Sequence, residues 1–299
     1  PEIEELEKEI AEYCGTEDAV GVSSGTDALL ISLMVLDVGP GDIVLTSNFS
    51  FFATAGVVAR LNATPIFVDI DPETFNIDPQ KLRVTLNEMD EERRKRVKAI
   101  IPVHLYGQCS NMAEILKIAE NFHIPVIEDC AQAIGAECEI DGKIKCAGSI
   151  GDFGCFSFFP SKNLGGIGDG GIVTVNNSKL AELLRLKRVH GAERSYYHRI
   201  IGGNFRLDPV QATVIRIKLP HLNGWHQQRQ NNAKYYNKLF DESGLNDEVT
   251  TPLTMHPIKM QNPHIFNQYV IRTERRDELK SFLGAIGIAT GVYYPIPFH

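Results

Sequence analysis

The sequence of 299 residues lacks any apolar run that approaches the ~18 residues of a membrane-spanning helix. It also lacks an excess of positive charge, because 30 Lys and Arg stand against 38 Asp and Glu, and the formal net charge is -8. Basic residues gather in one place, residues 93–96, which we expect to be a solvated helix or loop. These absences argue against a protein that binds nucleic acid or a membrane.

The cysteines lack the spacing of metal sites and of redox pairs. There is no C-x-x-C pair, and no histidine stands at zinc-ligand spacing from a cysteine. We therefore predict free thiols in a reducing, cytoplasmic compartment and no bound metal. The six cysteines are Cys14, Cys109, Cys130, Cys138, Cys146 and Cys155.

Short apolar runs alternate with helix-periodic stretches over the first two thirds of the chain. The composition, 43% hydrophobic and 23% charged, is that of an ordinary globular protein with room for one large and one smaller domain. The alternation predicts an α/β fold, a mostly parallel seven-stranded sheet flanked by helices. Strands are expected near residues 19–22, 43–46, 65–68, 98–103, 124–128, 150–158 and 171–175, after an amphipathic helix at residues 2–13.

The composition changes after Leu219-Pro220. A helical stretch that contains the one Trp and several Gln, residues 223–239, precedes predicted strands near 249–251 and 266–272. We therefore predict a large domain over residues 1–219 and a smaller α+β domain over residues 220–299. Because the chain starts at Pro1 and stops inside an expected strand and loop, we expect it to be part of a longer protein.

Lys162 lies in a loop with a Pro-Ser entry and a Gly-Gly exit, SFFPSKNLGG at residues 157–166. Such turn signals can fix a loop, and a lysine amine held unprotonated is a nucleophile toward carbonyl groups. Most loop lysines are solvated charges, so the loop alone leaves both interpretations open.

Asp129 ends a short apolar run that begins at Ile124 and is expected to be a buried strand. In open α/β sheets ligands gather at the carboxyl ends of strands, so Asp129 and the nearby Gln132 are placed to face a ligand. A carboxylate there suits a pyridinium nitrogen. The alternative is that Asp129 caps the next helix.

A helix is expected to begin near Gly25, where small and polar residues precede an apolar, helix-periodic stretch. Free backbone N–H groups at a helix start attract anions, and the Ser24 and Thr26 hydroxyls add donors for a phosphate. Ser and Thr are also ordinary N-caps, so this segment alone leaves the capping interpretation open.

The glycines at residues 166–171 match G-x-G-x-x-G, the fingerprint of dinucleotide-binding sites. That fingerprint needs a strand before it and a helix after it, whereas residues 172–175 form a predicted strand. We therefore expect tight turns here and no nicotinamide site.

Ordered blocks along nearly the whole chain resemble the sugar-nucleotide aminotransferases of the DegT/StrS class, which are pyridoxal-phosphate enzymes of fold type I. The blocks are SGTDA at 24–28, PGD at 40–42, FSFFATA at 49–55, FVDID at 67–71, PVHLYGQ at 102–108, ED at 128–129, SFFPSKNLGG at 157–166, GDGG at 168–171, NFRLD at 204–208 and YYPIP at 293–297.

The resemblance implies roles around a pyridoxal 5'-phosphate cofactor. Lys162 forms the Schiff base, Asp129 pairs with the pyridine nitrogen, and Gln132 bonds the phenolic oxygen. Phe51 matches the aromatic residue that stacks on the ring. Its neighbours at positions 49 and 52 compete for that role, and a core position for Phe51 is the alternative.

Further matches concern the phosphate and the neighbouring subunit. Gly25, Thr26 and Ser157 match the phosphate cup. Asn204 matches a residue that reaches the phosphate of the partner's cofactor, which implies a homodimer with shared active sites. Arg206 is a candidate for holding the carboxylate of the donor or the substrate.

The resemblance also implies the substrates, a keto-sugar nucleotide and L-glutamate. The lysine loop and the segment that begins with Tyr293 and Tyr294 look closer to enzymes that aminate the sugar C3 carbon than to those acting at C4. The preferred substrate is a UDP-linked 3-keto sugar related to N-acetylglucosamine or its uronic acid, for lipopolysaccharide, lipid A or O-antigen synthesis. Both tyrosines are candidate substrate-binding residues. A dTDP-linked 3-keto-6-deoxy sugar or a 4-keto sugar is the alternative.

Two other classes share this fold family. A related sugar dehydratase has histidine in place of the lysine, so Lys162 argues against that class. A non-catalytic regulator is disfavoured because the lysine, Asp129, Gln132 and Ser157 are all present. His104 and His190 match family positions near the active site, but a lone histidine is more often a packed side chain than a catalyst.

Overall fold

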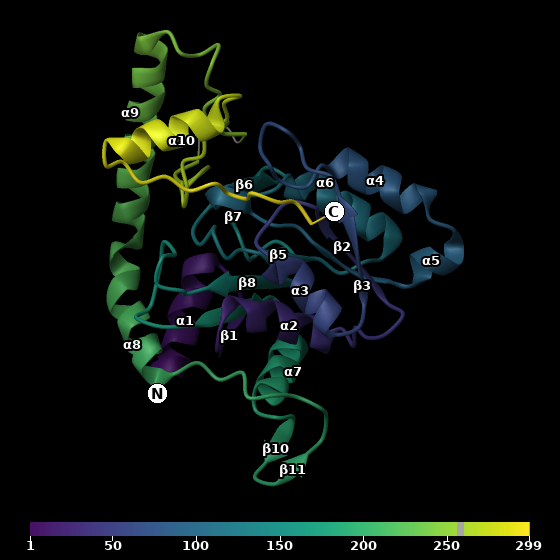
Figure 1. Ribbon diagram of the computed structural model, residues 1–299. Coiled ribbons are helices and arrows are strands. Elements are labelled where there is room, and N and C mark those ends of the chain that lie inside the picture. The colour runs from purple at the N-terminus through teal and green to yellow at the C-terminus, as the bar shows by residue number, and fades with distance from the viewer. Residues whose placement is uncertain (256–259, 299) are drawn as a thin grey trace.

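The computed structural model describes residues 1–255 and 260–298 (Figure 1). Its main sheet contains β1 (Asp18–Val22), β2 (Ile43–Ser47), β3 (Thr64–Val68), β4 (Val97–Ile101), β5 (Ile127–Asp129), β8 (Phe153–Ser157) and β9 (Gly171–Val175). A four-stranded part, β1-β9-β8-β5, and a three-stranded part, β3-β2-β4, are joined by the bridges Ile100–Val126 and Val103–Asp129. The predicted seven-stranded sheet is therefore confirmed.

The sheet is mostly parallel, as predicted. β9 is antiparallel to both of its neighbours, β1 and β8, and the other neighbouring strands run parallel. All five residues of β2 and of β9 are buried, as expected for strands of a sheet that is covered on both faces. Even the polar Thr46 is accommodated there, because its hydroxyl donates a hydrogen bond of 2.8 Å to the carbonyl oxygen of Ile101.

Helices cover both faces of the sheet. One buried cluster contains apolar residues of α1 (Glu2–Cys14), α4 (Pro79–Glu88), α6 (Met112–Phe122) and α8 (Pro209–Lys218). A second cluster contains those of α2 (Gly25–Val35), α3 (Ala53–Arg60) and α7 (Ser178–Arg188). The short α5 (Glu91–Lys95) has no buried residue, so the basic segment is a solvated helix, as expected.

Local signals set several helix ends. Asp78 and Asp208 accept backbone N–H groups at the starts of α4 and α8, and each is followed by a proline in the first helical turn. Gly15 ends α1 in the left-handed conformation, with φ 74°.

Two hairpins lie outside the main sheet, β6 (Glu137–Ile140) with β7 (Lys143–Cys146) and β10 (Ala192–Arg194) with β11 (Tyr197–His198). The second hairpin projects from the body of the protein at the bottom of Figure 1. Two short 3-10 turns complete the connections, η1 (Leu105–Gly107) and η2 (Leu219–His221).

The chain after η2 forms the long helix α9 (Leu222–Ser243), which extends away from the sheet in Figure 1, and α10 (Arg276–Ala285). The predicted strands near 249–251 and 266–272 are wrong: in the described chain these stretches share one bridge, between Thr250 and Arg272. A two-stranded pair with no third strand has little to stabilise it. The domain boundary after residue 219 stays a prediction, and it falls within η2.

No helix among the described residues combines the length and the apolar character that crossing a membrane requires.

Candidate functional site

The predicted site residues meet at one edge of the sheet. β1 and β8 are both antiparallel to β9, and β8 is parallel to β5, so β1, β5 and β8 point the same way. Asp129 ends β5, Ser157 ends β8, and Ser24 follows β1. The carboxyl ends of parallel strands are where α/β sheets bind ligands.

Asp129 is buried, with 5% of its surface exposed. Its Oδ2 accepts a hydrogen bond of 2.8 Å from the Thr54 hydroxyl, and its Oδ1 accepts one of 3.2 Å from the backbone N–H of Ala131. Burial raises the pKa of the Asp129 carboxyl, while these hydrogen bonds and the charge of Lys162 oppose the rise. In the described chain no helix lies between β5 and β6, so the alternative that Asp129 caps a following helix is wrong.

Lys162 lies in a closed loop beside this carboxylate. The loop is held by backbone hydrogen bonds from Lys162 to Phe159 and from Gly166 to Phe158, of 2.9 and 2.8 Å. Burial lowers the pKa of the Lys162 amine, and the negative charge of Asp129 opposes that shift. The Nζ atom makes no hydrogen bond or ion pair with a described residue. The lowered pKa favours the neutral amine, which is the form that acts as a nucleophile.

Gly165 allows this loop to close. A Cβ atom at this position would lie 2.5 Å from the carbonyl oxygen of Pro160. Only glycine fits so close an approach of two backbone segments.

The start of α2 approaches the end of β8 equally closely. A Cβ atom on Gly25 would lie 2.6 Å from the Cβ of Ser157, so glycine is needed for this contact. Ser24 is the N-cap, since its hydroxyl accepts a hydrogen bond of 3.0 Å from the backbone N–H of Asp27. The first N–H groups of the helix, the exposed Thr26 and the Ser157 hydroxyl thus share one place, which suits the phosphate of the expected cofactor.

Gln132 is fixed by its neighbours. Its Oε1 accepts a hydrogen bond of 2.7 Å from the backbone N–H of Tyr106, so its Nε2 faces outward, where it donates one of 3.0 Å to the Tyr294 hydroxyl. The Tyr106 hydroxyl donates to the carbonyl oxygen of Tyr293. Burial and the charge of Asp129 raise the pKa of Tyr294 to about 12, although the bond from Gln132 opposes this. The structure therefore brings Tyr294 to the predicted cofactor residue Gln132, and Tyr293 to Tyr106 beside it.

Phe51 is exposed, at 59%, where the chain enters α3. Its two competitors are engaged elsewhere: the ring of Phe49 contacts Phe75 and Tyr294, and the ring of Phe52 contacts Phe298. No ring contact to Phe51 exists among the residues that the structure describes. A core position for Phe51 is thus wrong, and its face is open to a ligand.

Asn204 and Arg206 are both exposed, on either side of Phe205. The backbone N–H of Ser23 donates a hydrogen bond of 2.9 Å to the carbonyl oxygen of Phe205, and Arg206 forms a bridge with Val22. This segment therefore runs beside the start of α2 with two polar side chains free to meet other molecules.

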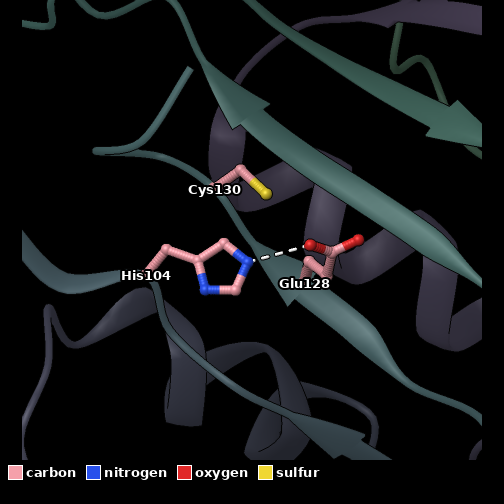
Figure 2. Close-up of side chains that lie close together, drawn as sticks. All are labelled: His104, Glu128 and Cys130. Atoms are coloured by element: carbon pink, nitrogen blue, oxygen red, sulfur yellow. Dashed lines mark hydrogen bonds and ion pairs between the residues drawn. The ribbon is translucent and has the colours of Figure 1, made fainter. Parts of the chain in front are cut away.

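Figure 2 shows a buried cluster of His104, Glu128 and Cys130, whose possible ligand atoms lie within 4.8 Å of one another. Nδ1 of His104 accepts from the backbone N–H of Ser110 at 3.1 Å, so Nε2 carries the hydrogen and donates to Glu128 at 2.9 Å. Glu128 also accepts three backbone N–H groups, from Gly148, Ile150 and Gly151.

These hydrogen bonds occupy the lone pairs that a cation would need, and burial raises the pKa of the Cys130 thiol. The cluster has a structural role at β5, which agrees with the interpretation of His104 as a packed side chain. His190, in contrast, is exposed next to β10. All six cysteines are free thiols, as predicted.

Sequence reasoning missed two contributors to the site. Thr54 was visible only as part of a matching block, yet it bonds Asp129. Tyr106 orients Gln132 through its backbone, with φ 59°, and no side-chain signal indicates that. The one sequence signal for Thr54 is that its hydroxyl stands four residues after that of Ser50 at the start of a helix.

Several proteins are similar to this chain over almost all of its length. The "Pleiotropic regulatory protein" of Geobacillus stearothermophilus is 47% identical over 99% of this chain and 76% of its own length. The "UDP-N-acetyl-3-dehydro-alpha-D-glucosamine 3-aminotransferase" of Acidithiobacillus ferrooxidans is 42% identical, with coverages of 98% and 74%. The "UDP-2-acetamido-2-deoxy-3-oxo-D-glucuronate aminotransferase" of Pseudomonas aeruginosa is 41% identical, with coverages of 100% and 78%.

Solved structures agree with the fold. A DegT/DnrJ/EryC1/StrS aminotransferase from Brucella abortus has a TM-score of 0.91 and 39% identity, covering 100% of this chain and 77% of its own. The ntda protein of Bacillus subtilis, solved with bound cofactor PMP, has a TM-score of 0.87 and 31% identity, with coverages of 100% and 65%. The model of one family matches residues 1–299, and we conclude that the chain belongs to the DegT/DnrJ/EryC1/StrS aminotransferase family.

Proposed function

We propose that this protein transfers an amino group from L-glutamate to a UDP-linked 3-keto sugar related to N-acetylglucosamine. The observation that carries this proposal is the pairing of Lys162 and Asp129: a half-buried amine with a lowered pKa beside a buried carboxylate at the end of β5. The predicted class, a transaminase acting on nucleotide-linked keto sugars, agrees with the family and with its named relatives.

The predicted cofactor, pyridoxal phosphate, is confirmed by the family and by the related structure that holds its amino form. When bound, it supplies an electron sink for negative charge at the reacting carbon. The residues present fit it: the N–H groups at the start of α2, with Thr26 and Ser157, would hold the phosphate, and Phe51 would cover one face of the ring. Gln132 would donate to the phenolic oxygen, as it now donates to that of Tyr294.

Asp129 and Lys162 control the two proton positions of the reaction, at the ring nitrogen and at the reacting carbon. The Asp129 carboxylate holds a proton on the pyridine nitrogen, and its burial strengthens that charge interaction. The Lys162 Nζ takes the proton from the donor carbon and returns one to the substrate carbon, which requires an amine that is neutral for part of the cycle. The lowered pKa of Lys162 serves that requirement.

The sugar is assigned from the names of the relatives. Two relatives with more than 40% identity are named for 3-keto derivatives of UDP-linked amino sugars, and this supports a C3 acceptor. A dTDP-sugar transaminase of Streptomyces venezuelae, 39% identical over 100% of this chain and 74% of its own length, keeps the dTDP-linked alternative open. We further propose that the product enters lipopolysaccharide or lipid A synthesis in the cytoplasm.

A homodimer with shared sites completes the proposal. Asn204 and Arg206 are exposed beside the start of α2, where they can meet a second copy of the chain. We assign Asn204 to the partner's cofactor phosphate and Arg206 to a donor or substrate carboxylate.

A regulatory role is the second candidate, because a relative with 47% identity bears the name of a regulatory protein. A protein that only regulates has no need of a half-buried lysine with a lowered pKa beside a buried carboxylate. Turnover with glutamate, followed by the absorbance of the bound cofactor, separates the two roles, because turnover supports catalysis.

The test is to incubate the purified protein with pyridoxal phosphate, glutamate and each candidate sugar, UDP-linked or dTDP-linked, and to locate the new amine by NMR. We expect an amine at C3 of the UDP-linked sugar. Amination of the dTDP-linked sugar alone would overturn the substrate assignment, and no amination of any keto sugar would overturn the function.

A further inference from the structure

Thr54 is the second residue of α3, and its side chain is fully buried, at 0% exposure. A buried hydroxyl has to find hydrogen-bond partners, because leaving it unpaired costs free energy. Three oxygen atoms lie within reach of its Oγ1: Oδ2 of Asp129 at 2.8 Å, Oγ of Ser50 at 3.1 Å, and the carbonyl oxygen of Phe51 at 3.2 Å.

The direction of these hydrogen bonds follows from the atoms. A hydroxyl has one hydrogen, and an ionised carboxylate can only accept. The shortest contact assigns the Thr54 hydrogen to Asp129, so the Ser50 hydroxyl donates to Thr54. Ser50 is buried too, at 4% exposure, and the two hydroxyls form a chain from Ser50 through Thr54 to the carboxylate.

We propose that Thr54 is a positioning residue of the transamination, whose hydroxyl orients the Asp129 carboxylate toward the pyridine nitrogen and keeps it ionised. This inference rests on the proposed function. Oδ1 is held by the backbone N–H of Ala131 at 3.2 Å, a longer contact than that of Thr54. Without Thr54, the buried carboxylate keeps one hydrogen bond, and it gains freedom to rotate or to take up a proton.

Loss of the Thr54 hydrogen bond would also affect the protonation of the pyridine nitrogen. Thr54 is, after burial, the largest influence on the pKa of Asp129, and it acts to lower it. A protonated Asp129 loses the charge that holds a proton on the pyridine nitrogen. The backbone N–H of Thr54 also donates a hydrogen bond of 3.2 Å to the carbonyl oxygen of Phe51, so one residue fixes the carboxylate relative to the residue proposed to stack on the ring.

The test compares Thr54→Val with Thr54→Ser. Valine keeps the branched shape and removes the hydroxyl, while serine keeps the hydroxyl. The matched control is Thr46→Val, which removes another fully buried hydroxyl, bonded to a backbone carbonyl of the same sheet at 2.8 Å. Two readouts are followed: the pH midpoint of the visible absorbance of the bound cofactor, and the rate of the half-reaction with glutamate.

We expect Thr54→Val to shift that midpoint by about one pH unit or more. The half-reaction should slow by about 10- to 100-fold, the scale of one hydrogen bond to a charged group, with KM for glutamate little changed. Thr54→Ser should restore most of both, and Thr46→Val should change neither. If Thr54→Val does not fold, Ser50→Ala gives a smaller shift in the same direction.

Wild-type midpoint and rate in Thr54→Val would overturn the positioning role while leaving the proposed function intact. Equal shifts in Thr54→Val and Thr46→Val would also overturn it, since the effect would then be one of packing. A wild-type protein that shows neither the cofactor absorbance nor the half-reaction would instead overturn the proposed function.

Discussion

The floor of the site, which we define as Asp129, Thr54 and Gln132, is held differently from its rim, which we define as Phe51, Asn204 and Arg206. Each floor residue is nearly fully buried and is hydrogen-bonded to its own chain. The rim side chains are exposed. Packing within one chain fixes the positions of the floor residues. The exposed rim side chains are available to contact other molecules.

Substitution of the lysine should have the largest effect. We expect Lys162→Ala to abolish transamination and to leave cofactor binding detectable, because the contacts from the start of α2, Ser157 and Asp129 remain. Absorbance of the bound cofactor and amination of the keto sugar are measured together. The control is Lys187→Ala, which removes a buried lysine outside the loop of Lys162. Turnover in Lys162→Ala would contradict its role as nucleophile and base.

Asp129→Asn tests the floor by charge alone. The shape is kept, but the carboxylate that holds the ring nitrogen protonated is lost, so we expect a rate loss of about a hundredfold or more, about 3 kcal/mol of barrier. Thermal stability should change far less. The control, Asp152→Asn, removes an exposed carboxylate that bonds the backbone N–H of Val126 at the opposite edge of the sheet. A loss below tenfold would make Asp129 a structural residue.

The sequence predicts best what depends on neighbours along the chain. The apolar runs locate all seven strands of the sheet, and Gly25 marks the start of α2. β5 begins at Ile127, later than predicted, because Pro125 has no N–H to contribute to a strand.

Contacts between distant segments were not predictable in this way. Thr54 and Asp129 are 75 positions apart, and Gln132 and Tyr294 are 162 positions apart. Each pair forms only because separate elements dock at one edge of the sheet. A single sequence carries no periodicity that reports such docking, so the strand end and the resemblance predict Asp129 and Gln132 but not the hydrogen bond from Thr54.

A subunit-mixing experiment tests the rim. Asn204→Ala and Lys162→Ala should each be inactive, but exchange of subunits gives a heterodimer in which one site has both original residues. Random exchange of equal amounts should restore about a quarter of the wild-type activity. Mixing Lys162→Ala with Asp129→Asn is the control, since those residues belong to one chain and every site stays defective. Confirmed exchange without activity would place Asn204 in its own chain's site.

The smallest effect on activity is expected at a buried polar group that, unlike those of the floor, has no hydrogen-bond partner among the described residues. His226 of α9 is fully buried, and neither ring nitrogen has a hydrogen-bond partner among the described residues. Burial, and to a lesser degree the charge of Arg229, lower its pKa to about 4.

The unfolded chain, with an ordinary histidine pKa of about 6.5, therefore binds a proton between about pH 6.5 and 4 that the folded protein does not. Stability from this group is complete above the upper value and falls as the pH drops toward the lower one, by about 3 kcal/mol in all. We expect His226→Leu to reduce this loss, measured by urea denaturation at pH 7 and pH 4.5, while activity at neutral pH is unchanged. The control is His221→Leu, at an exposed histidine of η2. If His226→Leu and wild type lose the same stability between the two pH values, the unpaired histidine is not the cause.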